Sequence, residues 1–283
     1  ILMLTTQVLI TQGILLGCVL LGWFAGGLIH KFADKRFEEG DLKGHELGRL
    51  SDTLAFVGGA VGILLGLLLS FAVADFDDTK GSIQNMGSSS LTIFSASESL
   101  NEDQRFEIRR DVVCALQSSI GNDWEAIGNN ERGGSRITTD WLLKLNNDVA
   151  HADLATIQQQ QNFPILVSGV AQLTDAREEL VMGNSALIPF VVWLVIYFSA
   201  FVMTALLAMH LADRKLLARI SAGMSWGMLA VILFALTVLD APLAPVFGTP
   251  TLEPKPIQET LQVLEESFPH SGLWAECTQP VKS

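Results

Sequence analysis

The sequence has few charged residues, and long parts of it have none. Only 17% of its 283 residues are Asp, Glu, Lys or Arg, whereas an average soluble domain contains about 25%. This composition excludes an ordinary soluble enzyme and a disordered chain. What remains is a protein that crosses a membrane several times, because four stretches have no charged side chain at all: 1–30, 54–74, 180–212 and 220–239.

Positive charge is scarcer than negative charge. The chain has 18 Lys and Arg against 30 Asp and Glu, which gives a formal net charge of −12. Most of the acidity falls in residues 75–179, with 8 basic and 17 acidic side chains, and in residues 240–283, with 2 and 6. A nucleic-acid-binding protein presents a basic surface to the phosphates, so we expect no nucleic-acid partner.

The sequence also lacks the common catalytic motifs. It contains no GxxxxGK[ST] phosphate-binding loop, no GxSxG nucleophile elbow and no HExxH zinc motif. Its five histidines are scattered, and the spacing of its three cysteines fits no zinc site. We therefore expect no catalytic residues, no metal and no cofactor, and we expect that the protein is not an enzyme.

Four apolar windows are long enough to cross a membrane, since a helix needs about 20 apolar residues to span roughly 30 Å of hydrocarbon. They cover about 8–29, 54–74, 187–209 and 220–239. The first is longer than the apolar part of a signal peptide and has no Lys or Arg before Lys31, so we expect it to be retained. The prediction is an all-α protein with four transmembrane helices.

Helical patterns continue in the polar segment 75–186, which predicts a helical domain inserted between the second and third spans. The second span is expected to continue as a helix to about Leu100. Asn101, followed by acidic residues, has the composition of a helix N-cap. Pro164 is expected to interrupt the pattern, and a helix that starts near residue 165 is expected to run into the third span.

Two prolines and a glycine after the fourth span predict an extended turn. Beyond it, Pro256 is expected to start a short amphipathic helix that packs on the polar domain. The predicted organisation is a first transmembrane hairpin at 1–74, the polar helical domain at 75–186, a second hairpin at 187–239 and a C-terminal tail at 240–283.

Small residues recur at a regular spacing in the second span. Gly58, Gly62 and Gly66 are four residues apart and therefore lie on one side of a helix. Such stripes let helices approach closely in lipid. The stripe indicates either helix packing within the chain, or a subunit contact or pore-lining face. In the pore interpretation Ser70 and Phe71 are further candidates for pore-facing positions.

Three acidic residues follow the second span. Asp75, Asp77 and Asp78 cluster where the helix is expected to leave the membrane. The simplest interpretation is a solvated boundary that ends the span. The functional alternative is an acidic ring at a pore mouth, which would attract cations if several subunits brought their second spans together.

Basic residues indicate the orientation. With four spans, both termini and the polar domain lie on one side, and the short loops 31–53 and 210–219 lie on the other. The positive-inside rule places these loops in the cytoplasm, because they hold most of the Lys and Arg near the spans. Cys114 and Cys277 would then lie outside, where a disulfide is permitted; the sequence leaves their pairing open. Cys18 lies within a span.

The layout resembles the bestrophin-like bacterial membrane proteins over about residues 10–265. The features that carry the resemblance are the polar helix after a glycine-rich second span (Phe76-Asp77-Asp78-Thr79-Lys80), an acidic-Trp pair (Asp123-Trp124), Arg177 ahead of Pro189 and Trp193 at the third span, and Asp240 and Pro242 with Phe247 and Gly248 after the fourth.

This resemblance implies a multi-pass protein of the bacterial plasma (inner) membrane that forms a homo-oligomer, with the lipid bilayer as its surroundings and a ring-shaped ion channel as its expected activity. Bestrophins proper keep their helical domain in the cytoplasm and carry a calcium-binding acidic run after the fourth span. Here the basic residues favour the opposite side, and no such run follows Asp240, so calcium gating is not expected. The alternative function is a non-catalytic accessory or scaffold subunit of a larger membrane complex.

Overall fold

The structure is a computed structural model, and the prediction of an all-α protein is confirmed. Within the described residues all regular secondary structure is helical, apart from a two-residue antiparallel ladder between β1 (Pro245–Val246) and β2 (Thr249–Pro250). The motif residues Asp240, Pro242, Phe247 and Gly248 lie outside the described residues. The structure describes residues 2–36, 43–128, 133–182, 188–210, 215–239, 245–246, 249–250, 252–269, 272–275 and 277.

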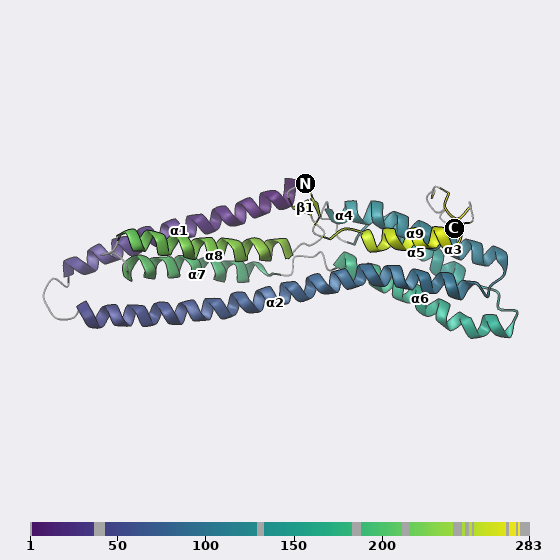
Figure 1. Ribbon diagram of the computed structural model, residues 1–283, viewed down its shortest axis with the longest axis horizontal. Helices are drawn as coiled ribbons and strands as arrows, with labels where there is room; N and C mark the ends of the chain where they lie inside the picture. The colour runs from purple at the N-terminus through teal and green to yellow at the C-terminus, as the bar shows by residue number, and fades with distance from the viewer. Residues whose placement is uncertain are drawn as a thin grey trace. The chain divides into compact units, whose positions relative to one another are not determined.

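The chain divides into two compact units. Residues 1–74 and 186–241 form one, called here the membrane unit, and residues 75–185 and 242–283 form the other, called the polar unit. Helix α2 (Lys43–Ser97) is a single helix of 55 residues that contributes to both units (Figure 1). The expectation that the second span continues as a helix almost to Leu100 is therefore confirmed.

The membrane unit consists of α1 (Leu2–Arg36), the first part of α2, α7 (Phe190–His210) and α8 (Lys215–Leu239). Helices α1, α7 and α8 lie side by side (Figure 1). Among the described residues, three helical segments are long and apolar enough to cross a membrane, and a shorter apolar segment lies in α8. The three segments are Leu9–Phe32, Asp52–Ser97 and Phe190–His210, and the shorter one is Gly223–Leu239.

Close contact between α1 and α7 depends on two glycines of α1. A Cβ atom on Gly22 would lie 2.5 Å from the backbone oxygen of Phe201, and one on Gly26 would collide with the backbone oxygen of Ala205. Small residues therefore let these helix backbones approach, as in other membrane helix pairs. The core beside this contact contains the buried side chains of Leu15, Val19, Leu65, Ala72, Ile188, Ile196, Ala200, Leu233 and Leu236.

The polar unit has one continuous apolar core. Its largest fully buried side chains come from α2, α3, α5 and α6, and Ile257 and Leu264 of α9 are buried in the same core. The C-terminal helix therefore packs on the polar unit, as the sequence predicted. The helices are the second part of α2, α3 (Glu102–Ser118), the π-helix η1 (Ser119–Asp123), α4 (Trp124–Gly128), α5 (Arg136–Ala150), α6 (Ile157–Met182) and α9 (Lys255–Ser267).

Helix boundaries follow local chemistry at several points. The side chain of Asn101 accepts a hydrogen bond from the backbone N–H of Gln104 at 2.9 Å, so the predicted N-cap is confirmed. The expected interruption at Pro164 is wrong, because Pro164 lies inside α6. A proline removes one hydrogen bond from a helix, but buried Leu166 and Val170 on the following turns hold α6 against the core.

The expected continuation of this helix into the third span is also wrong. Helix α6 ends at Met182, and α7 begins at Phe190. The backbone N–H of Val192 donates to the oxygen of Pro189 at 2.9 Å. Because proline has no N–H to donate, it suits the position just ahead of a helix, and Pro189 opens a new helix here.

Candidate functional site

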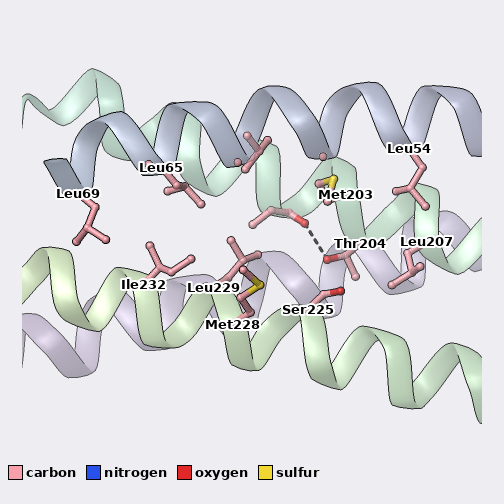
Figure 2. A pocket seen from close by; sticks show the side chains of 15 residues that line it. Leu54, Leu65, Leu69, Met203, Thr204, Leu207, Ser225, Met228, Leu229 and Ile232 are labelled. Carbon is pink, nitrogen blue, oxygen red and sulfur yellow. Dashed lines mark hydrogen bonds between the residues drawn. The ribbon is translucent and has the colours of Figure 1, made fainter.

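The membrane unit contains a cavity of about 370 Å³ between α2, α7 and α8. Figure 2 shows leucines of α2 pointing across it toward side chains of α8. The hydroxyl of Thr204 donates to the backbone oxygen of Ala200 at 2.8 Å, so this polar group is satisfied. The lining is otherwise almost wholly apolar, with Leu54, Leu65, Leu69, Leu207, Leu229 and Ile232 among its residues.

The predicted glycine stripe lies along this cavity. Gly58, Gly62 and Gly66 all line it. A Cβ atom on Gly58 would lie 3.3 Å from the Met203 side chain, whereas one on Gly62 or Gly66 would meet no atom within 4 Å. In this chain the stripe therefore leaves space instead of making a tight helix contact. The role of the stripe in a pore or subunit contact stays a prediction.

Ser70 and Phe71 do not line the cavity. Both are exposed, and Phe71 follows Ile63 and Leu67 at successive spacings of four residues. Residues four apart lie close together on a helix surface. The exposed fractions of these three large side chains are 69%, 53% and 64% in chain order. Helix α2 therefore buries one face, around Leu65, and leaves a row of large apolar side chains uncovered by its own chain.

The three acidic residues at the start of the polar unit differ in their exposure, and their role at a pore mouth stays a prediction. Asp77 and Asp78 are exposed, while Asp75 is half-buried with one carboxylate oxygen buried and unpaired. The hydroxyls of Thr79 and Ser82 donate to the backbone oxygens of Asp75 and Asp78 at 2.9 and 3.0 Å. Asp77 and Asp78 are therefore the members of the predicted group whose charge is open to solvent.

Two of the motif residues meet in the core of the polar unit. Arg177 of α6 donates from Nε and a terminal nitrogen to both carboxylate oxygens of Asp123, each at 3.0 Å. The side chain of Asp123 is fully buried and that of Arg177 is 7% exposed. Such a two-pronged pair has the strongest geometry available to arginine. It joins η1 to α6 across 54 positions of sequence.

The same ion pair holds the start of α5. The backbone N–H of Ser135 donates to Asp123 at 2.6 Å, and Arg177 donates to the Ser135 oxygen at 2.9 Å. Gly134 has a φ of +66°, and a Cβ atom there would lie 2.9 Å from both charged side chains. A residue larger than glycine would therefore be strained and would push against the pair.

A disulfide joins α3 to the C-terminal segment. Cys114 and Cys277, whose pairing the sequence left open, are bonded and their Cα atoms lie 5.5 Å apart. Arg110, four residues before Cys114, donates to the backbone oxygen of Gly272 at 2.6 Å. The indole of Trp274 donates to the oxygen of Phe268 at 3.0 Å. The C-terminal segment is thus held by covalent and polar contacts.

An acidic cluster surrounds one lysine between α3 and α5. Lys144 lies 2.6 Å from Asp111, 2.9 Å from Asp148 and 3.4 Å from Glu107. Burial raises the pKa of Asp111 to about 7, although Lys144 acts in the opposite direction. Burial alone would raise the pKa of Asp148, but hydrogen bonds with Lys144 and Asp111 hold it below its ordinary value.

The carboxylates of this cluster are close enough to share a cation, with one oxygen of each within 4.8 Å of the others. The ammonium group of Lys144 already occupies that position. Burial would lower its pKa, but hydrogen bonds with Asp111 and Asp148 hold the pKa above its ordinary value. A protonated lysine has no lone pair for a metal, so the cluster carries its own cation.

The bestrophin-like domain family matches residues 23–249 of the sequence. The chain belongs to the bestrophin-like family. It is accordingly a membrane protein, in agreement with its apolar helices. A comparison with curated proteins finds no match.

Solved structures share the bestrophin-like fold. Two variants of a bacterial bestrophin homologue from Klebsiella pneumoniae have TM-scores of 0.63 and 0.62 and are 13% and 14% identical to this chain. The matches cover 90% and 89% of this chain and 99% and 98% of theirs. A variant of a protein described only as a membrane protein has a TM-score of 0.62, with 12% identity over 92% of this chain and 98% of the other.

Some of these contacts join residues that the sequence had singled out, and others do not. Asp123 and Arg177 were singled out as separate motif residues, and only the fold shows that they pair. The sequence did not predict the Asp111–Lys144 contact. The signal for it was three acidic residues, Glu107, Asp111 and Asp148, on helices that also carry buried apolar residues. Trp193 stacks on Tyr197, with ring centroids 6.0 Å apart.

Proposed function

We propose that the protein is a subunit of an oligomeric ion channel and that it is not an enzyme. The observation that carries the proposal is the match to the bestrophin-like family over residues 23–249. The shared fold with a bacterial bestrophin homologue supports it, because the match spans nearly all of both chains.

The pore is proposed to lie along the uncovered face of α2. Several copies of α2 around an axis would bring Ile63, Leu67 and Phe71 together as apolar rings, and apolar constrictions gate channels by excluding water. Exposed Asp77 and Asp78 follow on the same helix and would attract cations to the pore entrance. The net charges of −9 and −4 in residues 75–179 and 240–283 favour cations in the same way.

We propose four transmembrane helices, with α8 as a further span beside the three long apolar segments. Helix α9 follows α8 in sequence and is buried in the same core as α3, which follows α2. Both segments must therefore lie on one side of the membrane, which requires two crossings between them. Helix α8 supplies the second of these, because its 25 residues give a length of about 37 Å.

The polar unit is proposed to lie outside the cytoplasm. The loops 31–53 and 210–219 hold most of the Lys and Arg near the spans, and the positive-inside rule assigns such loops to the cytoplasm. The Cys114–Cys277 bond supports the same orientation, since disulfides persist in oxidising compartments. Both termini would then lie on the outer side of the bacterial plasma membrane.

Cross-linking tests the arrangement of α2. In a Cys18→Ser background, Phe71→Cys should form covalent multimers with a short bismaleimide, because neighbouring copies would face one another across a narrow pore. The readout is a ladder on a reducing denaturing gel of membranes. Phe198→Cys is the matched control, since Phe198 of α7 is also an apolar residue, 63% exposed, but is proposed to face lipid.

A ladder for Phe71→Cys that is several-fold stronger than for Phe198→Cys supports the proposal. Equal cross-linking of the two positions, or none at residue 71 in a protein that labels fully with a monofunctional maleimide, contradicts it.

A further inference from the structure

The acidic cluster around Lys144 holds more negative than positive charge. Asp111 and Glu107 of α3 and Asp148 of α5 surround a single ammonium group at 2.6–3.4 Å. With all three carboxylates ionised, one lysine leaves an excess of two negative charges. Neighbouring charges of one sign repel strongly when water is excluded from one of them.

Asp111 is the member of the cluster whose charge is not stabilised by contact with water. Its side chain has no exposed surface, and its second carboxylate oxygen is buried without a hydrogen-bond partner. An unpaired buried acceptor on an ionised group is costly. A proton on Asp111 would remove the charge, and Asp148, one of whose carboxylate oxygens lies within 4.8 Å of one of Asp111, is the neighbouring acceptor for it.

We propose that this cluster is a proton-responsive contact between α3 and α5, in which Asp111 takes up a proton and shares it with Asp148 while Lys144 remains bound to both. The proton enters without displacing the lysine, whereas a metal ion would have to expel it. This inference concerns the polar unit alone and does not depend on the proposed channel function.

The protonation of Asp111 depends on the charged groups around it. Lys144 and Asp148 of α5 act on it directly, and Glu107 is linked through Lys144. The other charges on α3 are Glu102, Asp103, Arg105 and Arg109, the last two paired with Glu98, and Arg110, bonded to Gly272. Those on α5 and on the other elements packed against α3 are Arg136, Asp140, Asp123 (paired with Arg177), Lys255 (paired with Glu253), Glu259, Glu265 and Glu266.

The direction of the pH effect follows from the pKa of Asp111. Burial raises this pKa from 3.8 to about 7 in the folded chain. A carboxyl with a raised pKa contributes stability that is complete below its unfolded value and is lost as the pH rises through its folded value. The stability that this proton gives should therefore fall from about pH 4 to just above pH 7, and the last part of the fall, between about pH 6 and pH 8, is where Asp111 loses its proton in the folded chain.

Thermal unfolding of the full chain in lipid nanodiscs tests the proposal. The melting temperature of the wild type should fall by about 3 °C between pH 6 and pH 8 beyond any fall seen in Asp111→Asn. Asparagine reproduces the protonated carboxyl, since it can accept from Lys144 and donate to Asp148. Asp140→Asn, on the same helix α5, is the control and should keep the wild-type slope.

A second measurement uses the wild type and so does not depend on a variant that folds. Infrared difference spectra should show a protonated buried carboxyl at pH 6 that is lost by pH 8. Equal pH slopes in the wild type and Asp111→Asn, absence of that band, or stabilisation at pH 8 by added Ca²⁺ or Zn²⁺ in the wild type would each overturn the proposal.

Discussion

Replacing Arg177 with methionine should lower the free energy of unfolding of the polar unit by about 3–5 kcal/mol. Arg177→Met keeps much of the apolar stem and removes the charge that neutralises Asp123. Among the described residues, the fully buried Asp123 carboxylate would then keep only the N–H of Ser135 as a partner. Chemical unfolding of the full chain in detergent, followed by tryptophan fluorescence, measures the loss.

Arg105→Met is the matched control. Arg105 also forms an ion pair, at 3.0 Å to Glu98, but the two side chains are 29% and 61% exposed. Exposed pairs contribute less than about 1 kcal/mol, so this substitution should change stability little. A similar decrease of the free energy of unfolding in both variants would mean that burial of the Asp123–Arg177 pair does not increase its contribution to stability.

Removing the disulfide should have the second large effect. Cys277→Ser opens a covalent link between positions 163 apart in sequence, and loss of a native disulfide typically costs about 2–5 kcal/mol. The polar contacts of Arg110 with Gly272 and of Trp274 with Phe268 remain, so the segment should loosen without the core around Leu264 being lost. Unfolding of the wild type with and without reductant measures the same loss independently.

The disulfide also reports the orientation of the chain. If the polar unit lies outside the cytoplasm, protein taken from cells under thiol-blocking conditions should have one free thiol, that of Cys18. Cys18→Ser should then have none and should match the stability of the wild type. Three blocked thiols in the wild type would place the polar unit in a reducing compartment and would contradict the proposed topology.

Much of the helical fold could be predicted from the sequence, because its causes are local. Charge-free windows define the apolar helices in lipid, and the Asn101 cap depends on neighbouring residues alone. Helix continuity was harder to predict. Pro164 interrupts a local pattern, but it lies within α6 because buried residues hold that helix against the core. The spacing of apolar residues does not indicate the π-helix η1 between α3 and α4.

The contacts that hold the polar unit could not be predicted, because they join distant positions. Asp123 and Arg177 are 54 residues apart, and Asp111 and Lys144 are 33 apart. Nothing in the spacing of either pair shows that the two side chains meet. The glycine stripe of α2 was visible, but its place along a cavity depends on how α7 and α8 pack.

Ion flow through the reconstituted protein distinguishes an ion channel from a scaffold subunit. In planar bilayers with a salt gradient, the purified full chain should carry a cation-selective current, and the double variant Asp77→Asn, Asp78→Asn should shift the reversal potential toward zero. Glu125→Gln, an exposed carboxylate of α4, should leave it unchanged. A chain that is incorporated as an oligomer yet carries no current would contradict the proposed channel function. A current that selects anions would contradict the proposed role of the acidic residues.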